Sequence, residues 1–149
     1  MPELTENRVL PHKAQDIFDL VMDIEKYPDF LPWCKKAKIV DRVAEDNLQA
    51  DLVINFKAFT EKYRSDVKFY NQKGVFIIES RAISGPFKNL HSEWKISADK
   101  DDDKNCNIEF YISFSFNSFI LEKMIGGIFE RASKKMIESF EKRACLVLM

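Results

Sequence analysis

The chain has 149 residues and a mass of 17.5 kDa, a size typical of one domain with its own hydrophobic core. Hydrophobic residues make up 46% and charged residues 32% of the sequence, which excludes an intrinsically disordered chain with too little apolar surface to fold. Because 23 Lys and Arg face 24 Asp and Glu, the net charge of −1 argues against a protein that coats DNA through phosphate contacts.

The sequence shows no internal repeat and no linker, so we expect a single domain over residues 1–149. The cysteines Cys34, Cys106 and Cys145 are far apart and predict neither a disulfide framework nor a zinc site, and a reducing compartment is the simpler inference. The start of the chain is polar and unlike a signal peptide, and no apolar run approaches the length of a membrane span. We therefore expect a cytoplasmic protein whose membrane contact, if it has one, is peripheral.

The first elements are a short strand and a helix. Residues 4–10 are a weak strand candidate that stops at Pro11. From residue 13 to 25, apolar residues recur on one helical face: Ala14, Ile17, Phe18, Val21 and Ile24. Pro28 is expected to end this helix, since the residue before a proline avoids helical angles. The aromatic segment 27–33 that follows holds Pro28 and Pro32 and is expected to be rigid and irregular.

Residues 36–98 have the pattern of antiparallel strands. Apolar or small residues alternate with polar ones in three stretches: Ala50 to Phe56, Tyr63 to Phe69, and Leu90 to Ile96. A period of two with charges on one side indicates strands with one face buried. A further strand is predicted from Val75 to Ala82, and the turn residues 84–86 close it.

The last strand and the C-terminal helix complete the predicted domain. Residues 106–117 alternate strictly and are long enough to bend around a partner. From Leu121 to Val147 the apolar spacing predicts one long helix, which Ser118 would cap. The order of strand, helix, run of strands and long helix predicts an α+β domain with a helix packed across a curved antiparallel sheet.

Few residues suggest catalysis or metal binding. The acidic run 99–105 lacks the glycine and glutamate of a calcium loop and predicts a solvated hairpin turn. His12 and His91 have no neighbouring carboxylate or cysteine in a spacing that suggests a metal-ligand set or a catalytic triad, and they are expected at the surface. Glu79 and Arg81 either point inward as an acid/base pair or mark a strand leaving the core; the second is favoured because charged residues are rarely buried. No catalytic residue and no metal ligand is predicted.

Two glycines stand inside the predicted C-terminal helix. The stripe Phe110, Phe114 and Phe116 could face this helix as ordinary core. However, Gly126 and Gly127 each cost about 1 kcal/mol relative to alanine in a helix interior. The pair is explained equally well by close packing or by room for a bound guest.

Three segments resemble one known family. Residues 20–34 closely resemble the signature of the coenzyme Q-binding family, which also contains the bacterial ribosome-association toxin and belongs to the START-like polyketide cyclase/dehydrase superfamily. Residues 85–94 resemble its second signature, and residues 110–116 and 136–144 are similar to its last strand and helix. The resemblance covers residues 8–147 and implies a helix-grip fold, in which the sheet wraps the C-terminal helix around an elongated apolar cavity.

The resemblance implies a non-enzymatic protein that holds ubiquinone or a related polyprenyl lipid, and that supports quinone synthesis and respiratory electron transfer. Trp33 is similar to the quinone-binding branch of the family, and peripheral contact with the inner membrane fits such a ligand. With this cavity we expect ligand contacts from twelve residues: Tyr27, Phe30, Trp33, Tyr63, Trp94, Phe110, Phe114, Met124, Ile125, Gly127, Ile128 and Met136.

Two other functions remain open. The first is a toxin-like factor that binds the large ribosomal subunit and blocks subunit joining, for which residues 131–143 offer five basic against two acidic side chains. That stretch is equally well explained as the solvated face of a helix. The second is a cyclase or dehydratase that uses an inward acid such as Glu79, although no pair of titratable residues is linked by sequence spacing.

Overall fold

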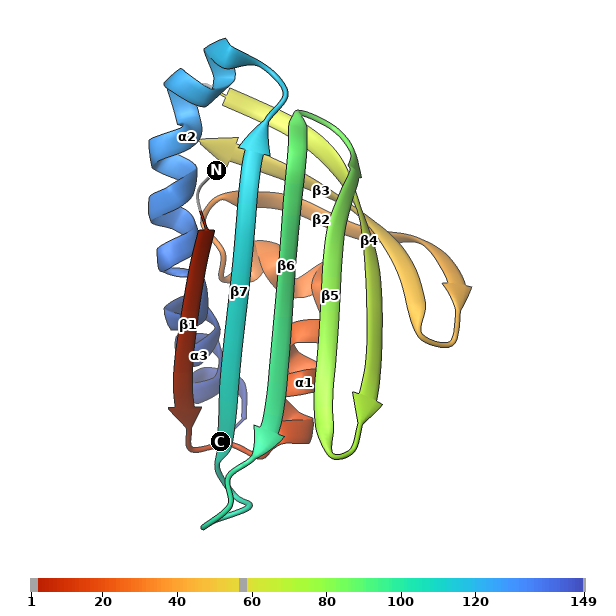
Figure 1. The fold of residues 1–149 in the computed structure, drawn as a ribbon, viewed down its shortest axis with the longest axis vertical. Coiled ribbons are helices and arrows are strands. Elements are labelled where there is room, and N and C mark those ends of the chain that lie inside the picture. The colour runs from red at the N-terminus through yellow and green to blue at the C-terminus, as the bar shows by residue number, and fades with distance from the viewer. Residues whose placement is uncertain (1–2, 57–58, 149) are drawn as a thin grey trace.

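The computed structural model describes residues 3–56 and 59–148, and it confirms the predicted α+β architecture (Figure 1). Seven antiparallel strands form one sheet in the order β1-β7-β6-β5-β4-β3-β2. The strands are β1 (Glu3–Leu10), β2 (Cys34–Ala44), β3 (Asn47–Phe56), β4 (Phe59–Gln72), β5 (Val75–Ser84), β6 (Phe87–Ala98) and β7 (Cys106–Phe116). The helices are α1 (Ala14–Met22), the 3₁₀ helix η1 (Ile24–Asp29), α2 (Phe119–Lys134) and α3 (Met136–Val147).

The sheet is strongly curved, and β2 and β3 run at a steep angle to β5, β6 and β7 (Figure 1). Alternate residues of β3 and β7 are buried on its concave face, as their sequence patterns predict. The pairing of β2 with β3 shifts register at three points, and such bulges increase the local twist of a strand. The curvature leaves a concave surface that the helices cover.

The first helix is shorter than its apolar pattern predicts. It ends at Met22, where Asp23 leaves the helical region with φ −81° and ψ 62°. The chain then forms η1, which contains Pro28 instead of stopping before it. The Tyr27 hydroxyl donates a hydrogen bond to the Val21 carbonyl and so ties η1 to the end of α1. The apolar spacing up to Ile24 therefore covers two helical elements rather than one.

The single C-terminal helix predicted from Leu121 to Val147 is two helices. They meet at Lys135, where φ −94° and ψ 0° depart from α-helical values. Two residues earlier, the Ser133 hydroxyl donates to the Phe129 carbonyl, and this kind of back-bonding often bends a helix. The apolar pattern runs on across the break because both helices pack against the same core. The predicted cap at Ser118 is confirmed, since its hydroxyl accepts the Leu121 N–H at 3.4 Å.

The turns between strands agree with the sequence. Residues 99–105 connect β6 to β7, and the Asp99 N–H donates to the Asn105 carbonyl at 3.0 Å. Gly85 follows β5 with φ +117°, and a side chain there would lie within 2.9 Å of the Lys62 carbonyl oxygen.

The described residues contain no cluster of side chains that could hold a metal ion. Across the same residues, no helix is long and apolar enough to cross a membrane.

The two glycines of α2 have different surroundings. A Cβ on Gly126, which is buried, would lie 2.8 Å from a Glu122 carboxylate oxygen, whereas Gly127 is exposed and has only an Arg131 nitrogen at 3.8 Å. Gly127→Ala is therefore expected to stabilise the protein by about 1 kcal/mol, because alanine restrains the unfolded chain and favours the helix. Thermal unfolding followed by circular dichroism measures the effect, which corresponds to a rise in Tm of about 2–4 °C.

The matched control is Gly126→Ala. It makes the same chemical change one residue earlier, but it must displace Glu122, whose carboxylate also accepts the Phe116 N–H at 3.3 Å. We expect a smaller gain or a loss of stability. Equal gains at both positions would contradict the close approach of Glu122 to Gly126.

Candidate functional site

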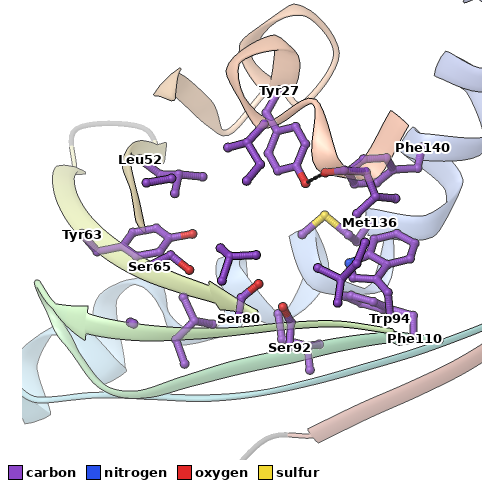
Figure 2. Close-up of a pocket in the computed structure, with 18 of the residues that line it drawn as sticks. Tyr27, Leu52, Tyr63, Ser65, Ser80, Ser92, Trp94, Phe110, Met136 and Phe140 are labelled. Atoms are coloured by element: carbon purple, nitrogen blue, oxygen red, sulfur yellow. Dashed lines mark hydrogen bonds between the residues drawn. The ribbon is translucent and has the colours of Figure 1, made fainter. Parts of the chain in front are cut away.

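A cavity of about 80 Å³ lies between the concave face of the sheet and the helices. Its wall includes side chains from α1, η1, strands β3 to β7, α2 and α3 (Figure 2). Six of the twelve predicted contact residues line it: Tyr27, Trp33, Tyr63, Trp94, Phe110 and Met136. Helix and sheet thus enclose an apolar space at the place where the resemblance to a helix-grip fold leads one to expect it.

The other six predicted contact residues do not line this cavity. Phe114 and Ile125 are buried in the core, and Phe30 and Ile128 are partly buried against it. Met124 is 63% exposed and Gly127 lies on the outer side of α2. The residues of α2 that face inward instead follow a spacing of four from Ile125 through Phe129 to Ser133. The idea that the glycine pair makes room for a guest is therefore wrong for this cavity.

One end of the cavity is aromatic. The Trp94 ring packs against Phe110 and Phe140 with centroid distances of 4.7 and 5.0 Å. Tyr27 packs edge-on against Phe140 at 5.3 Å and directs its hydroxyl to the Val21 carbonyl rather than into the cavity. The Met136 sulfur faces the space beside these rings (Figure 2). Rings and a thioether suit an apolar guest.

The sheet side of the cavity carries four hydroxyl groups, which extend from Ser92, next to Trp94 on β6, through Ser80 and Ser65 to Tyr63 (Figure 2). Ser80 of β5 and Ser92 of β6 are direct cross-strand partners, and Ser65 lies on the inward face of the adjoining strand β4. Burial raises the pKa of the Tyr63 hydroxyl far above its usual range, so this group stays neutral. The prediction of ligand contacts omitted all three serines, although the alternation of β4 and β6 had already placed Ser65 and Ser92 on the inward face.

No Asp, Glu, Lys, Arg, His or Cys is among the described residues that line the cavity. Glu79 lies on the outer face of β5, where its carboxylate accepts a hydrogen bond from the Tyr70 hydroxyl at 3.3 Å. Glu79 and Arg81 therefore do not form an inward pair, but the favoured interpretation is wrong as well, because the strand stays on the core here and its neighbours Ser80 and Ala82 line the cavity. Burial raises the pKa of Cys34 to about 12 and that of Cys106 to about 11, so both thiols are protonated at neutral pH. The titratable groups among the described wall residues are the hydroxyls of Tyr27 and Tyr63, and burial raises the pKa of both far above its usual range.

Basic side chains gather on two surfaces. In the predicted patch 131–143, three of the five cations are paired: Lys134 with Glu130, Lys142 with Glu138, and Arg143 with Asp29. The second surface, which was not predicted, is the edge strand β2, which exposes Lys35, Lys36, Lys38 and Arg42. Among the described residues, none of these four has a carboxylate within 4.0 Å. The pattern Lys35-Lys36-Ala37-Lys38 was the available signal.

Comparisons with known proteins agree with this architecture. The family described as polyketide cyclase/dehydrase and lipid transport matches residues 10–141. The ribosome association toxin RatA of Rickettsia prowazekii is 40% identical over 145 residues, which cover 97% of this chain and 97% of that protein. A mitochondrial coenzyme Q-binding protein homolog of Xenopus laevis is 26% identical and is matched over 95% of this chain and 57% of its own length.

A solved structure gives the same fold. The START superfamily protein of Mycobacterium smegmatis superposes with a TM-score of 0.76 at 15% identity, over 95% of both chains. At this identity the likeness concerns the fold alone. It confirms the START-like, helix-grip arrangement of sheet and helices.

Proposed function

Since the chain belongs to the polyketide cyclase/dehydrase and lipid transport family, we propose that it binds a lipid-like ligand in its cavity without transforming it. The observation that carries this proposal is the composition of the wall, which is apolar with a few hydroxyls and has no charged residue among those described. Acid/base chemistry of the cyclase type needs a group that titrates near neutral pH close to the substrate, and the described wall has no carboxylate, imidazole, amine or thiol, only tyrosines whose pKa burial raises. We therefore place binding ahead of catalysis.

Ubiquinone or a polyprenyl relative remains a candidate for this ligand, supported by the likeness to a coenzyme Q-binding protein. The wall of a cavity of about 80 Å³ must move to admit a long isoprenoid tail or any other long alkyl chain. Met136 is suited to move, because its unbranched side chain has three rotatable bonds and it stands at the start of α3, next to the break at Lys135. A tail would enter by displacing this side chain.

The test is to extract the purified protein with organic solvent and to identify the co-purified molecules by mass spectrometry. Adding the identified compound back at about a hundred times its Kd should stabilise the protein by about 2.7 kcal/mol. The expected result is one class of apolar compound at close to one molecule per chain, together with a rise in Tm. An empty extract, with no thermal shift for quinones of any tail length, would overturn the ligand-binding function.

For the cellular role, we propose association with the large ribosomal subunit ahead of quinone transport. The support is the 40% identity to a ribosome association toxin over nearly the whole of both chains, against 26% to the coenzyme Q-binding relative. This reverses the order that the family resemblance implied. The unpaired lysines of β2 provide a surface that can contact rRNA phosphates, and such a role places the protein in the cytoplasm.

A further inference from the structure

We infer that the cavity selects a neutral ligand whose oxygen-bearing end lies at the hydroxyls of Tyr63, Ser65, Ser80 and Ser92. Its apolar end would lie against Trp94, Phe110 and Phe140. The inference rests on the proposed ligand-binding function and deepens it, because it names the chemical class and the orientation of the ligand.

The first support is the arrangement of the hydroxyls. Ser80 and Ser92 are opposite each other on neighbouring strands, so their Cβ atoms are about 5 Å apart. Ser65 pairs with Ala82, one inward position along β5 from Ser80, and Tyr63 is the next inward residue of β4. Figure 2 shows these residues along the sheet side of the cavity, from Ser92, the inward neighbour of Trp94 on β6, to Tyr63 at the end away from Trp94. They form one polar surface rather than scattered groups.

The second support is that these hydroxyls have no partner within the described protein. No side chain or backbone group of residues 3–56 or 59–148 forms a hydrogen bond with the side-chain oxygen of Tyr63, Ser65, Ser80 or Ser92. By contrast, the hydroxyl of Tyr27, which lines the same cavity, is bonded to the Val21 carbonyl. Polar groups inside proteins are normally paired, so the free hydrogen-bonding capacity of these four is directed at the occupant of the cavity.

The third support is the charge of the wall. A carboxylate or phosphate inside the cavity would face no cation among the described lining residues, and a buried charge without a partner is strongly unfavourable. A hydroxyl both donates and accepts, so it can pair equally well with a carbonyl, an ether or an alcohol. The class is therefore a neutral, oxygen-bearing, largely apolar molecule, as opposed to a fatty acid or a phospholipid headgroup.

Three probes with the same twelve-carbon chain separate the contribution of the hydroxyls from the effect of a charge on the ligand: dodecanol, dodecane and dodecanoate at neutral pH. The chain has 2 tryptophans, Trp33 and Trp94, and both line the cavity, so intrinsic fluorescence reports binding directly. We expect dodecanol to bind tightest, dodecane about 10-fold more weakly and dodecanoate more weakly still. Dodecanoate binding as tightly as dodecanol would overturn the inference but leave the ligand-binding function standing.

The variant that tests orientation is Ser80→Ala with Ser92→Ala. The double variant should lower the affinity for dodecanol by about 10-fold or more and leave the affinity for dodecane unchanged, because only the alcohol forms hydrogen bonds with these hydroxyls. The fold should be kept, since neither hydroxyl is hydrogen-bonded within the described protein, and Ser97→Ala on the opposite face of β6 is the matched control. An unchanged ratio of dodecanol to dodecane affinity would overturn the inference. If none of the three probes binds the wild-type protein, the ligand-binding function itself fails.

Discussion

Replacing Lys35, Lys36 and Lys38 with Glu is expected to abolish pelleting of this protein with the large ribosomal subunit. The three lysines are exposed on the edge strand β2 and have no ion pair among the described residues, so all three are available to phosphates. Reversing their charge replaces attraction by repulsion along the same strand. Pelleting of the wild type should weaken steeply with salt, and removing one lysine–phosphate interaction should lower the slope of log K against log salt by about one.

Two further variants make this result specific. The first is a control that replaces three other exposed lysines with Glu: Lys88, Lys100 and Lys104. None of them has an ion pair among the described residues, so the change in net charge is the same but its place is different. Pelleting should stay intact. Arg131→Glu with Lys135→Glu tests the patch 131–143, where these are the two cations without an ion pair among the described residues, and should have a smaller effect. Wild-type protein that fails to pellet at any salt concentration would refute ribosome association.

The sheet was predictable because each strand with one buried face shows it directly in the sequence. The alternation of Ala50, Leu52, Ile54 and Phe56 determined both the strand and its inward face, and all four are buried. The helices were less predictable at their ends. An apolar spacing near four continues across Met22 and Lys135, but it reports only which face is buried and not where backbone angles change. The local causes of these breaks, such as the Ser133 hydroxyl, leave no periodic signal.

The candidate site was predictable in part for a related reason. Large aromatic residues at inward strand positions, such as Trp94 and Phe110, were predicted to contact a ligand, and they do line the cavity. On α2, however, apolar residues occur on more than one face, so the sequence could not separate exposed Met124 from buried Phe129. Serine at an inward strand position is easily taken for a tolerated small residue. Their role as ligand contacts is indicated only by the structure, in which Ser80 lies opposite Ser92 and neither hydroxyl has a hydrogen-bond partner among the described residues.

Replacing Ser80 with Leu is expected to abolish ligand binding while the protein remains folded. The side chain points into a cavity of about 80 Å³, so the added carbons occupy the space that a guest needs. We expect the affinity for dodecanol to fall by at least about 100-fold, or about 2.7 kcal/mol. Stability should hold or rise, since the new apolar atoms become buried; in a site already filled, the same change would cost about 1–3 kcal/mol.

Ser97→Leu adds the same atoms to the outer face of the sheet and should leave dodecanol affinity unchanged. Wild-type affinity in Ser80→Leu would mean that the ligand binds elsewhere. The folded variant also separates the two proposed roles, because the lysines of β2 are not part of the cavity wall. If ribosome association depends only on surface charge, Ser80→Leu should pellet like the wild type. Loss of pelleting in a stably folded Ser80→Leu protein would instead show that occupancy of the cavity controls the surface that meets the ribosome.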